Sequence, residues 1–183
     1  MTSAGSVDGN DRLRLFCALR LPDDVLDRIE RWQREHLRDG RIVSRGNLHA
    51  TLAFLGTRPA AELPGVAAAL ADACRSAGAI ELSVRRYRET RSVGMLVFDD
   101  CTQEAGRLAA RLFDGLEQLG VYEREKRPWL PHVTVLRFRT PPRLDPPLPD
   151  LGAFSPSEAA VYHSLLRPSG AQYAVLEHVA LGG

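Results

Sequence analysis

Apolar residues along the chain recur with two different periods, so their order predicts an alternation of strands and helices. Short apolar or alternating runs bounded by turn residues predict strands, whereas apolar residues three and four positions apart predict amphipathic helices. The predicted strands are 13–19, 42–43, 48–56, 80–86, 94–99, 132–137, 159–166 and 173–181. The predicted helices are one with an acidic start at 21–24 that Gly40 closes, then 60–78 and 101–120.

Proline and glycine mark several ends of these elements. Pro64 lies near the start of the second helix, where proline is tolerated. Gly46 and Asn47 form a turn signal before the strand that Gly56 ends. The proline-rich segment 141–149 is expected to be an extended connection within the domain, because the residues after it must still complete a sheet.

The order of elements gives two similar halves, each with strands and one or two helices. This order predicts an α+β fold of antiparallel sheets flanked by helices. Residues 1–11 are rich in Gly, Ser and Asp and nearly free of large apolar residues, so we expect a disordered lead-in. The remaining residues, 12–183, are expected to form a single domain, since the chain of 183 residues suits one globular unit.

Composition and net charge limit the binding partners and the cellular compartment that we expect for this protein. The formal charge is +1, so the chain lacks the global basic field that drives non-specific binding to nucleic acids, and any RNA contact is expected to be local. The cysteines number three and show no C-x-x-C spacing, which argues against a disulfide framework and a zinc site. Without a signal peptide or a long apolar stretch, we expect a cytoplasmic protein with no membrane partner.

Two strands carry the same arrangement of chemical groups. His49 and Thr51 stand two positions apart in one apolar strand, and His132 and Thr134 repeat the pattern in another. Successive side chains of a strand point to opposite faces, so each histidine shares a face with its threonine. If the two strands face each other, the site holds two imidazoles and two hydroxyls at the same depth. Such a set suits an anionic phosphate centre.

These segments resemble the two His-x-Thr signatures of the 2H phosphoesterase superfamily. The segment 47–56 is similar to the RNA 2′,3′-cyclic phosphodiesterase branch of this superfamily, whose members are also called 2′-5′ RNA ligases. Segments 14–22, 127–132 and 165–173 resemble that branch in the same order. The resemblance implies two pseudo-symmetric lobes with an active-site groove between them, where the histidines face each other.

The resemblance also implies roles for the motif residues. It implies that the protein hydrolyses RNA 2′,3′-cyclic phosphate ends to a 2′-phosphate without a metal ion. His49 would be the general acid and His132 the general base, and 2′-5′ ligation would be the reverse reaction. Thr51 and Thr134 would bind the phosphate oxygens. Arg137 matches a phosphate-binding arginine of the family, although simple alternation places it on the face opposite His132.

The polar and aromatic residues outside the two motifs either have a structural interpretation or a role that stays undecided. His36, His163 and His178 lack the downstream threonine and are expected to be structural or surface residues. Trp129 is expected to pack over the sheet edge rather than stack on a base. The arginine-rich loop 85–91 is either a solvated loop or an RNA contact.

The substrate stays open at this stage. Besides an RNA end, a 2′-5′ oligoadenylate, a small cyclic nucleotide or an ADP-ribose cyclic phosphate fits a His-Thr pair, and a non-catalytic RNA-end binding module is a further alternative. Departures from the family pattern at Ala50, 44–46 and Leu136 affect the shape of the groove rather than its chemistry. No cofactor and no metal ion is expected, because neither motif has a third nearby ligand. A monomer is expected.

Overall fold

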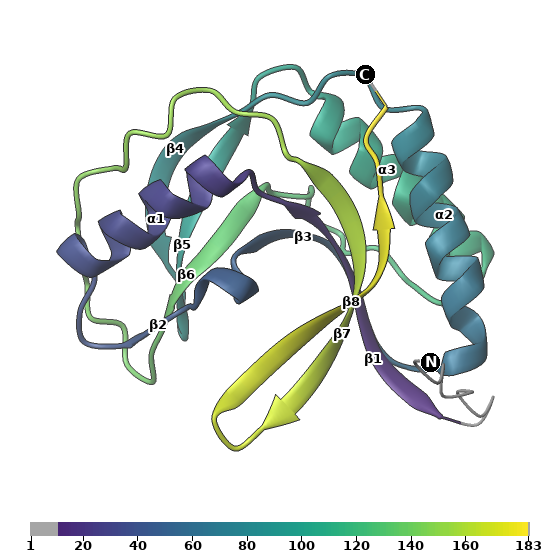
Figure 1. The fold of residues 1–183 in the computed structure, drawn as a ribbon, viewed down its shortest axis with the longest axis horizontal. Helices are drawn as coiled ribbons and strands as arrows, with labels where there is room; N and C mark the ends of the chain where they lie inside the picture. The colour runs from purple at the N-terminus through teal and green to yellow at the C-terminus, as the bar shows by residue number, and fades with distance from the viewer. Residues whose placement is uncertain (1–10, 183) are drawn as a thin grey trace, which may run out of the picture.

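The computed structural model describes residues 11–182, which form eight strands and three α-helices (Figure 1). The strands are β1 (Arg12–Arg20), β2 (Arg41–Ile42), β3 (His49–Pro59), β4 (Leu82–Glu89), β5 (Val93–Asp100), β6 (His132–Arg137), β7 (Glu158–Arg167) and β8 (Gly170–Val179). The helices are α1 (Asp23–His36), α2 (Leu63–Arg75) and α3 (Glu104–Gln118), with short 3₁₀ turns at Arg45–Asn47 and Ala60–Glu62.

The strands form two four-stranded sheets, in the orders β3-β1-β7-β8 and β2-β6-β5-β4. Every pairing within them is antiparallel, so the predicted α+β class is confirmed. Each sheet contains one of the two His-x-Thr strands, β3 in the first and β6 in the second. These two strands contact each other where the sheets meet.

The helices cover the sheets away from this junction. Helix α1 lies over the sheet of β4, β5 and β6, whereas α2 and α3 pack together on the other side of the molecule (Figure 1). The apolar stripe of α1 buries Val25, Ile29 and Trp32, and the Trp32 ring lies 6.1 Å from that of Tyr87 in β4. One continuous core of buried side chains joins both sheets and all three helices.

Several predicted boundaries are wrong by a few residues, each for a local reason. The first helix ends at His36, because Leu37 is already extended and Gly40 lies in the following turn. Gly56 does not end its strand: it adopts a positive φ of 71° at an irregularity of the pairing with β1, and β3 continues to Pro59. The closing hairpin is tighter than expected, since β8 begins at Gly170.

The remaining segments agree with the expectations where the structure describes them. Apart from an isolated bridge at Phe154, residues 138–157 form neither helix nor strand, in keeping with the predicted extended connection. Residues 1–10 of the predicted lead-in lie outside the described part of the chain. Among the helices of residues 11–182, none is long and apolar enough to cross a membrane.

Candidate active site

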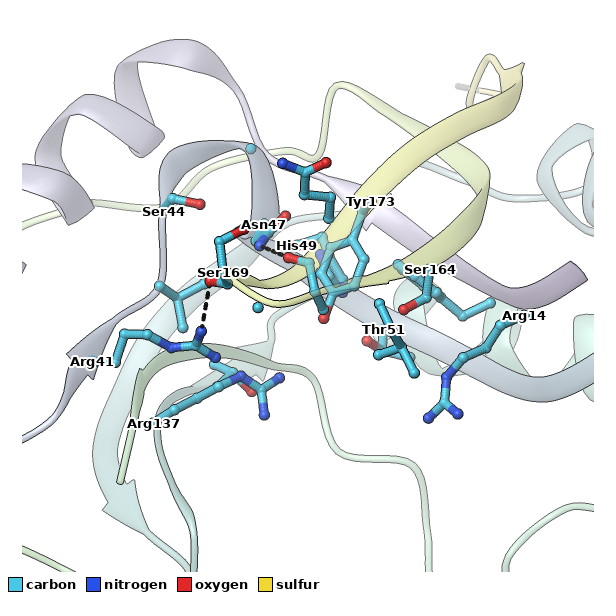
Figure 2. A pocket seen from close by; sticks show the side chains of 18 of the residues that line it. Arg14, Arg41, Ser44, Asn47, His49, Thr51, Arg137, Ser164, Ser169 and Tyr173 are labelled. Atoms are coloured by element: carbon cyan, nitrogen blue, oxygen red, sulfur yellow. Dashed lines mark hydrogen bonds between the residues drawn. The ribbon is translucent and has the colours of Figure 1, made fainter. Parts of the chain in front are cut away.

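A cavity of about 920 Å³ lies between the two sheets and contains both motifs. Its wall includes His49 and Thr51 from β3 and His132 and Thr134 from β6. Segment 41–47 and the β7–β8 hairpin close the opposite sides. The predicted meeting of two His-x-Thr strands is therefore present, and Figure 2 shows the cavity from the side of His49 and Thr51.

His49 is held by aromatic rings. Its imidazole stacks on Phe16 with ring centroids 4.9 Å apart and on Tyr162 at 5.6 Å, and the edge of Tyr173 lies 5.2 Å away. Phe16 and Tyr162 stack on each other at 4.8 Å, so the rings form one rigid group. This packing fixes the plane of the imidazole before any substrate arrives.

The environment of His49 disfavours its charged form. Burial among the rings lowers its pKa to about 4, because an imidazolium loses hydration there, and the positive charges of His132 and Arg137 act in the same direction. The carbonyl of Asn47 opposes this effect by favouring the protonated ring. Within residues 11–182 the buried Nδ1 atom has no hydrogen-bond partner, whereas Nε2 remains accessible from the cavity.

His132 has the equivalent position on the other strand. Its Nδ1 lies 2.8 Å from the carbonyl oxygen of Leu130, two residues earlier, so Nδ1 carries a proton and Nε2 is the nitrogen that faces the cavity. The backbone carbonyl two residues before His49, that of Asn47, also interacts with its imidazole. His132 is thus oriented by a hydrogen bond to the backbone just upstream, whereas His49 is held mainly by the stacked rings of Phe16 and Tyr162.

The threonine hydroxyls are free to bind a ligand. Thr51 and Thr134 are half-buried, line the cavity and donate no side-chain hydrogen bond to any residue from 11 to 182. The backbone of Thr51 is fixed, because its carbonyl accepts a 3.0 Å hydrogen bond from the indole of Trp129. Trp129 thereby ties the approach to β6 to the middle of β3, which fits the expectation that it packs over the sheet edge.

Arg137 reaches the cavity through a β-bulge. Thr134 pairs with Met95 and Leu136 with Gly94, so Val135 is an extra residue in β6. Both Val135 and Leu136 are fully buried, and the alternation is therefore shifted by one position. The bulge therefore places Arg137 on the same face of the strand as Thr134. Simple alternation had placed it on the opposite face.

Two further arginines, which the sequence did not single out, line the cavity. Arg41 pairs directly with Arg137 across β2 and β6, and Arg14 enters from β1 on the opposite side (Figure 2). None of the three forms an ion pair within the described chain, and the cavity wall contains no Asp or Glu. Other arginines of residues 11–182 form ion pairs on the surface, and nothing in the sequence positions of Arg14 and Arg41 separates them from those.

The β7–β8 hairpin forms a wall of the cavity and is attached to segment 41–47 by two hydrogen bonds. Asn47 Nδ2 donates to the carbonyl of Ala171 at 2.9 Å, and the Arg41 guanidinium donates to that of Ser169 at 3.2 Å. Gly170, with a φ of 116°, packs so closely on Arg41 that a Cβ would clash with the guanidinium. The hairpin and the arginine therefore position each other.

The arginine-rich segment 85–91 lies away from the cavity. Its strand part belongs to β4, an edge strand, and none of its residues lines the site. Arg85 approaches Asp99 at 3.8 Å, and Tyr87 is half-buried against Trp32. The structure gives this segment no place in the site.

The residues outside the motifs follow the structural interpretation. The cavity wall includes none of His36, His163 and His178. Cys74 is buried in the core, and among residues 11–182 no three His, Cys, Asp or Glu side chains gather as a metal-binding cluster.

Two antiparallel sheets that each present a His-x-Thr strand to a basic cavity define a two-histidine phosphoesterase. The chain belongs to the 2′-5′ RNA ligase superfamily, whose family model matches residues 21–166.

Individual relatives agree in fold and in length. The chain is 33% identical to the RNA 2′,3′-cyclic phosphodiesterase of Thermus thermophilus, with 93% of this chain and 91% of the relative covered. It is 29% identical to the protein of the same name from Escherichia coli, at 92% and 96% coverage. Among solved structures, TT0787 of Thermus thermophilus has a TM-score of 0.80 at 30% identity, covering 93% of this chain and 99% of that one. LigT of E. coli in complex with NADP+ has a TM-score of 0.79 at 27% identity, with 94% and 99% covered.

Proposed function

We propose that the protein hydrolyses RNA 2′,3′-cyclic phosphate ends to 2′-phosphates with His49 and His132 as its acid–base pair. The observation that carries the proposal is the shared cavity, whose wall contains both histidines and both threonines, with no side-chain hydrogen bond from either hydroxyl to residues 11–182. The names of the Thermus and E. coli relatives support the same substrate.

The reaction needs one proton to be removed and one to be supplied. A base takes a proton from water, the water oxygen bonds to phosphorus, and the bond from phosphorus to the 3′ oxygen breaks. An acid then protonates that oxygen, which leaves a 2′-phosphate and a 3′ hydroxyl. General acid and base catalysis of this kind contributes roughly a hundred- to ten-thousandfold per group.

The remaining polar groups bind the phosphate. The hydroxyls of Thr51 and Thr134 donate to its non-bridging oxygens, and they hold phosphorus in line between the two imidazoles. The Arg137 guanidinium neutralises the charge that grows in the transition state. With a 5′ hydroxyl in place of water as the nucleophile, the same bond to the 3′ oxygen breaks and the site joins the two ends as a 2′-5′ linkage.

The family resemblance orders the pair, with His49 as acid and His132 as base. In the free protein the pKa of His49 is about 4, so its acid role depends on the substrate. A bound phosphate anion neutralises the Arg137 charge and attracts an imidazolium, which raises the pKa of His49 in the complex. The pH profile of kcat/KM reports the ionisation of both groups in the free protein.

Because the acid must be protonated and the base neutral, kcat/KM follows the product of the two fractions, and its pH profile has the same shape for either order of the pair. A cyclic phosphate with sulfur in place of the leaving oxygen needs no proton from an acid, so on this substrate His49→Ala should retain more activity than His132→Ala if His49 is the acid, and less if it is the base.

The deciding experiment is hydrolysis of a short RNA with a 2′,3′-cyclic phosphate end, in EDTA, by wild type, His49→Ala and His132→Ala. We expect wild-type turnover to a 2′-phosphate and a loss of two or more orders of magnitude in each variant. A 3′-phosphate product would show that the 2′ oxygen is the leaving group instead of the 3′ oxygen. Activity abolished by EDTA would contradict a metal-independent reaction.

Lengthening the RNA separates the remaining alternatives. A kcat/KM that grows with added nucleotides supports an RNA end, whereas a flat dependence favours a small cyclic nucleotide. Tight binding of the RNA without turnover identifies a non-catalytic binding module.

A further inference from the structure

A glutamine from outside the cavity holds the bulge that brings Arg137 into the site. Gln33, on the buried face of α1, is 1% exposed. Its Nε2 donates to the carbonyl oxygens of Val135, at 2.9 Å, and of Val43, at 3.0 Å. Both acceptors are carbonyls, so each of the two hydrogens of the amide NH₂ can donate to one of them.

The two carbonyls belong to the strands that carry the paired arginines. Val135 is the extra residue of the β6 bulge, two positions before Arg137. Val43 follows β2, two positions after Arg41, and its N–H donates to Val135 at 3.1 Å. Gln33 therefore closes the end of a β2–β6 pairing that is only two residues long.

Such a short pairing has few hydrogen bonds of its own. A bulge also leaves backbone groups of the longer strand without ladder partners, and buried carbonyls are costly unless they are bonded. The Gln33 amide supplies hydrogen bonds to both strands from a third element. Without the bulge, alternation returns Arg137 to the face opposite Thr134.

We propose that Gln33 is a positioning residue for the Arg137 guanidinium, acting through the Val135 bulge, and that it sets the affinity of the site for phosphate. The inference rests on the proposed function for its kinetic readout, but phosphate binding tests it without turnover. Gln33 does not touch the cavity itself.

The test compares Gln33→Met, which keeps the length of the side chain and removes both donors, with Ile29→Val. Ile29 is fully buried one turn earlier on the same helix, so this control perturbs the packing of α1 without touching the bulge. We expect Gln33→Met to raise KM for the cyclic phosphate RNA about tenfold with a smaller change in kcat, and to weaken inorganic phosphate binding similarly. The control is expected to lose stability but keep both values.

The double variant that combines Gln33→Met with Arg137→Met tests whether Gln33 acts on phosphate binding through Arg137. If Gln33 acts through Arg137, Gln33→Met adds no further loss of phosphate binding in the Arg137→Met background. Additive losses, or an unchanged KM and phosphate Kd in the single variant, overturn the proposal and leave Gln33 with a purely structural role. Should Gln33→Met not fold, Gln33→Asn keeps the amide at shorter reach and is expected to give an intermediate loss.

Phosphate is titrated by NMR while the imidazole signal of His132 is followed. A wild type that binds phosphate but does not turn over RNA refutes the proposed function, whereas weaker phosphate binding by Gln33→Met still supports the positioning role.

Discussion

Arg41 and Arg137 are direct cross-strand partners on β2 and β6, and both guanidinium groups line a cavity whose wall contains no carboxylate. Like charges placed opposite each other in a sheet are destabilising unless an anion lies between or beside them. Arg14, which forms no ion pair with any residue from 11 to 182, adds a third positive charge from the other side of His49. The site is therefore built for more negative charge than a single cyclic phosphate carries.

The excess of positive charge predicts a dependence on salt and on the length of the RNA. Replacing Arg14 or Arg41 by Met removes one phosphate contact each, so the slope of log(kcat/KM) against log salt should become shallower by up to about 0.7 per residue. Steady-state kinetics on RNAs of increasing length, between low and physiological salt, measure this slope. Arg88→Met, an exposed residue of β4 outside the cavity, is the control and should leave it unchanged. Identical slopes in all variants would contradict the role of these arginines.

The threonine hydroxyls predict a defect in the chemical step. Thr51→Val and Thr134→Val keep the shape of each side chain and remove one donor to the phosphate, so kcat should fall by roughly ten- to a thousandfold. Thr57→Val is the matched control, since Thr57 is exposed on the same strand as Thr51 but outside the cavity. Equal rates for all three variants would show that the hydroxyls do not bind the reacting phosphate.

The pKa of His49 predicts that acid weakens the fold. The folded pKa of about 4 lies below the ordinary value of 6.5, so between these values the unfolded chain binds a proton that the folded chain does not. The free energy of unfolding from this group is therefore fully present above pH 6.5 and is lost as the pH falls toward 4, by roughly 1–3 kcal/mol.

Urea unfolding at pH 7 and pH 4.5 measures the change. In His49→Gln the difference between the two pH values should shrink, whereas the same substitution at His163, which lies outside the cavity, should preserve it. A difference that persists in His49→Gln would assign the acid sensitivity to other groups.

The anchoring of the β7–β8 hairpin predicts a binding defect. Asn47→Ala removes the hydrogen bond to Ala171, worth about 1 kcal/mol, so KM should rise severalfold with little change in kcat. Glu177→Gln changes an exposed side chain of β8 outside the cavity, and it should behave like wild type. Kinetics with saturating RNA separate the two parameters, and a fall in kcat alone would speak against a wall that only holds substrate.

The motif residues were predictable because their geometry is local. A strand has a period of two, so His49 and Thr51, like His132 and Thr134, share a face wherever the strand lies in the fold. The amphipathic helices and most strands followed from the same short-range periodicity. Their ends were less certain, as at Gly56, because a glycine with positive φ is compatible with both a turn and a bulge inside a strand.

The rest of the site depends on contacts between distant residues, and only the tertiary structure decided it. Arg137 faces the phosphate site because β6 has one residue more than β5 at Val135, and a bulge is a property of the pairing rather than of either strand alone. Arg14 and Arg41 are indistinguishable in the sequence from surface arginines until β1 and β2 bring them to one cavity. The sequence by itself determined the two His-x-Thr pairs, and the pairing of strands far apart in the chain determined which charges surround them.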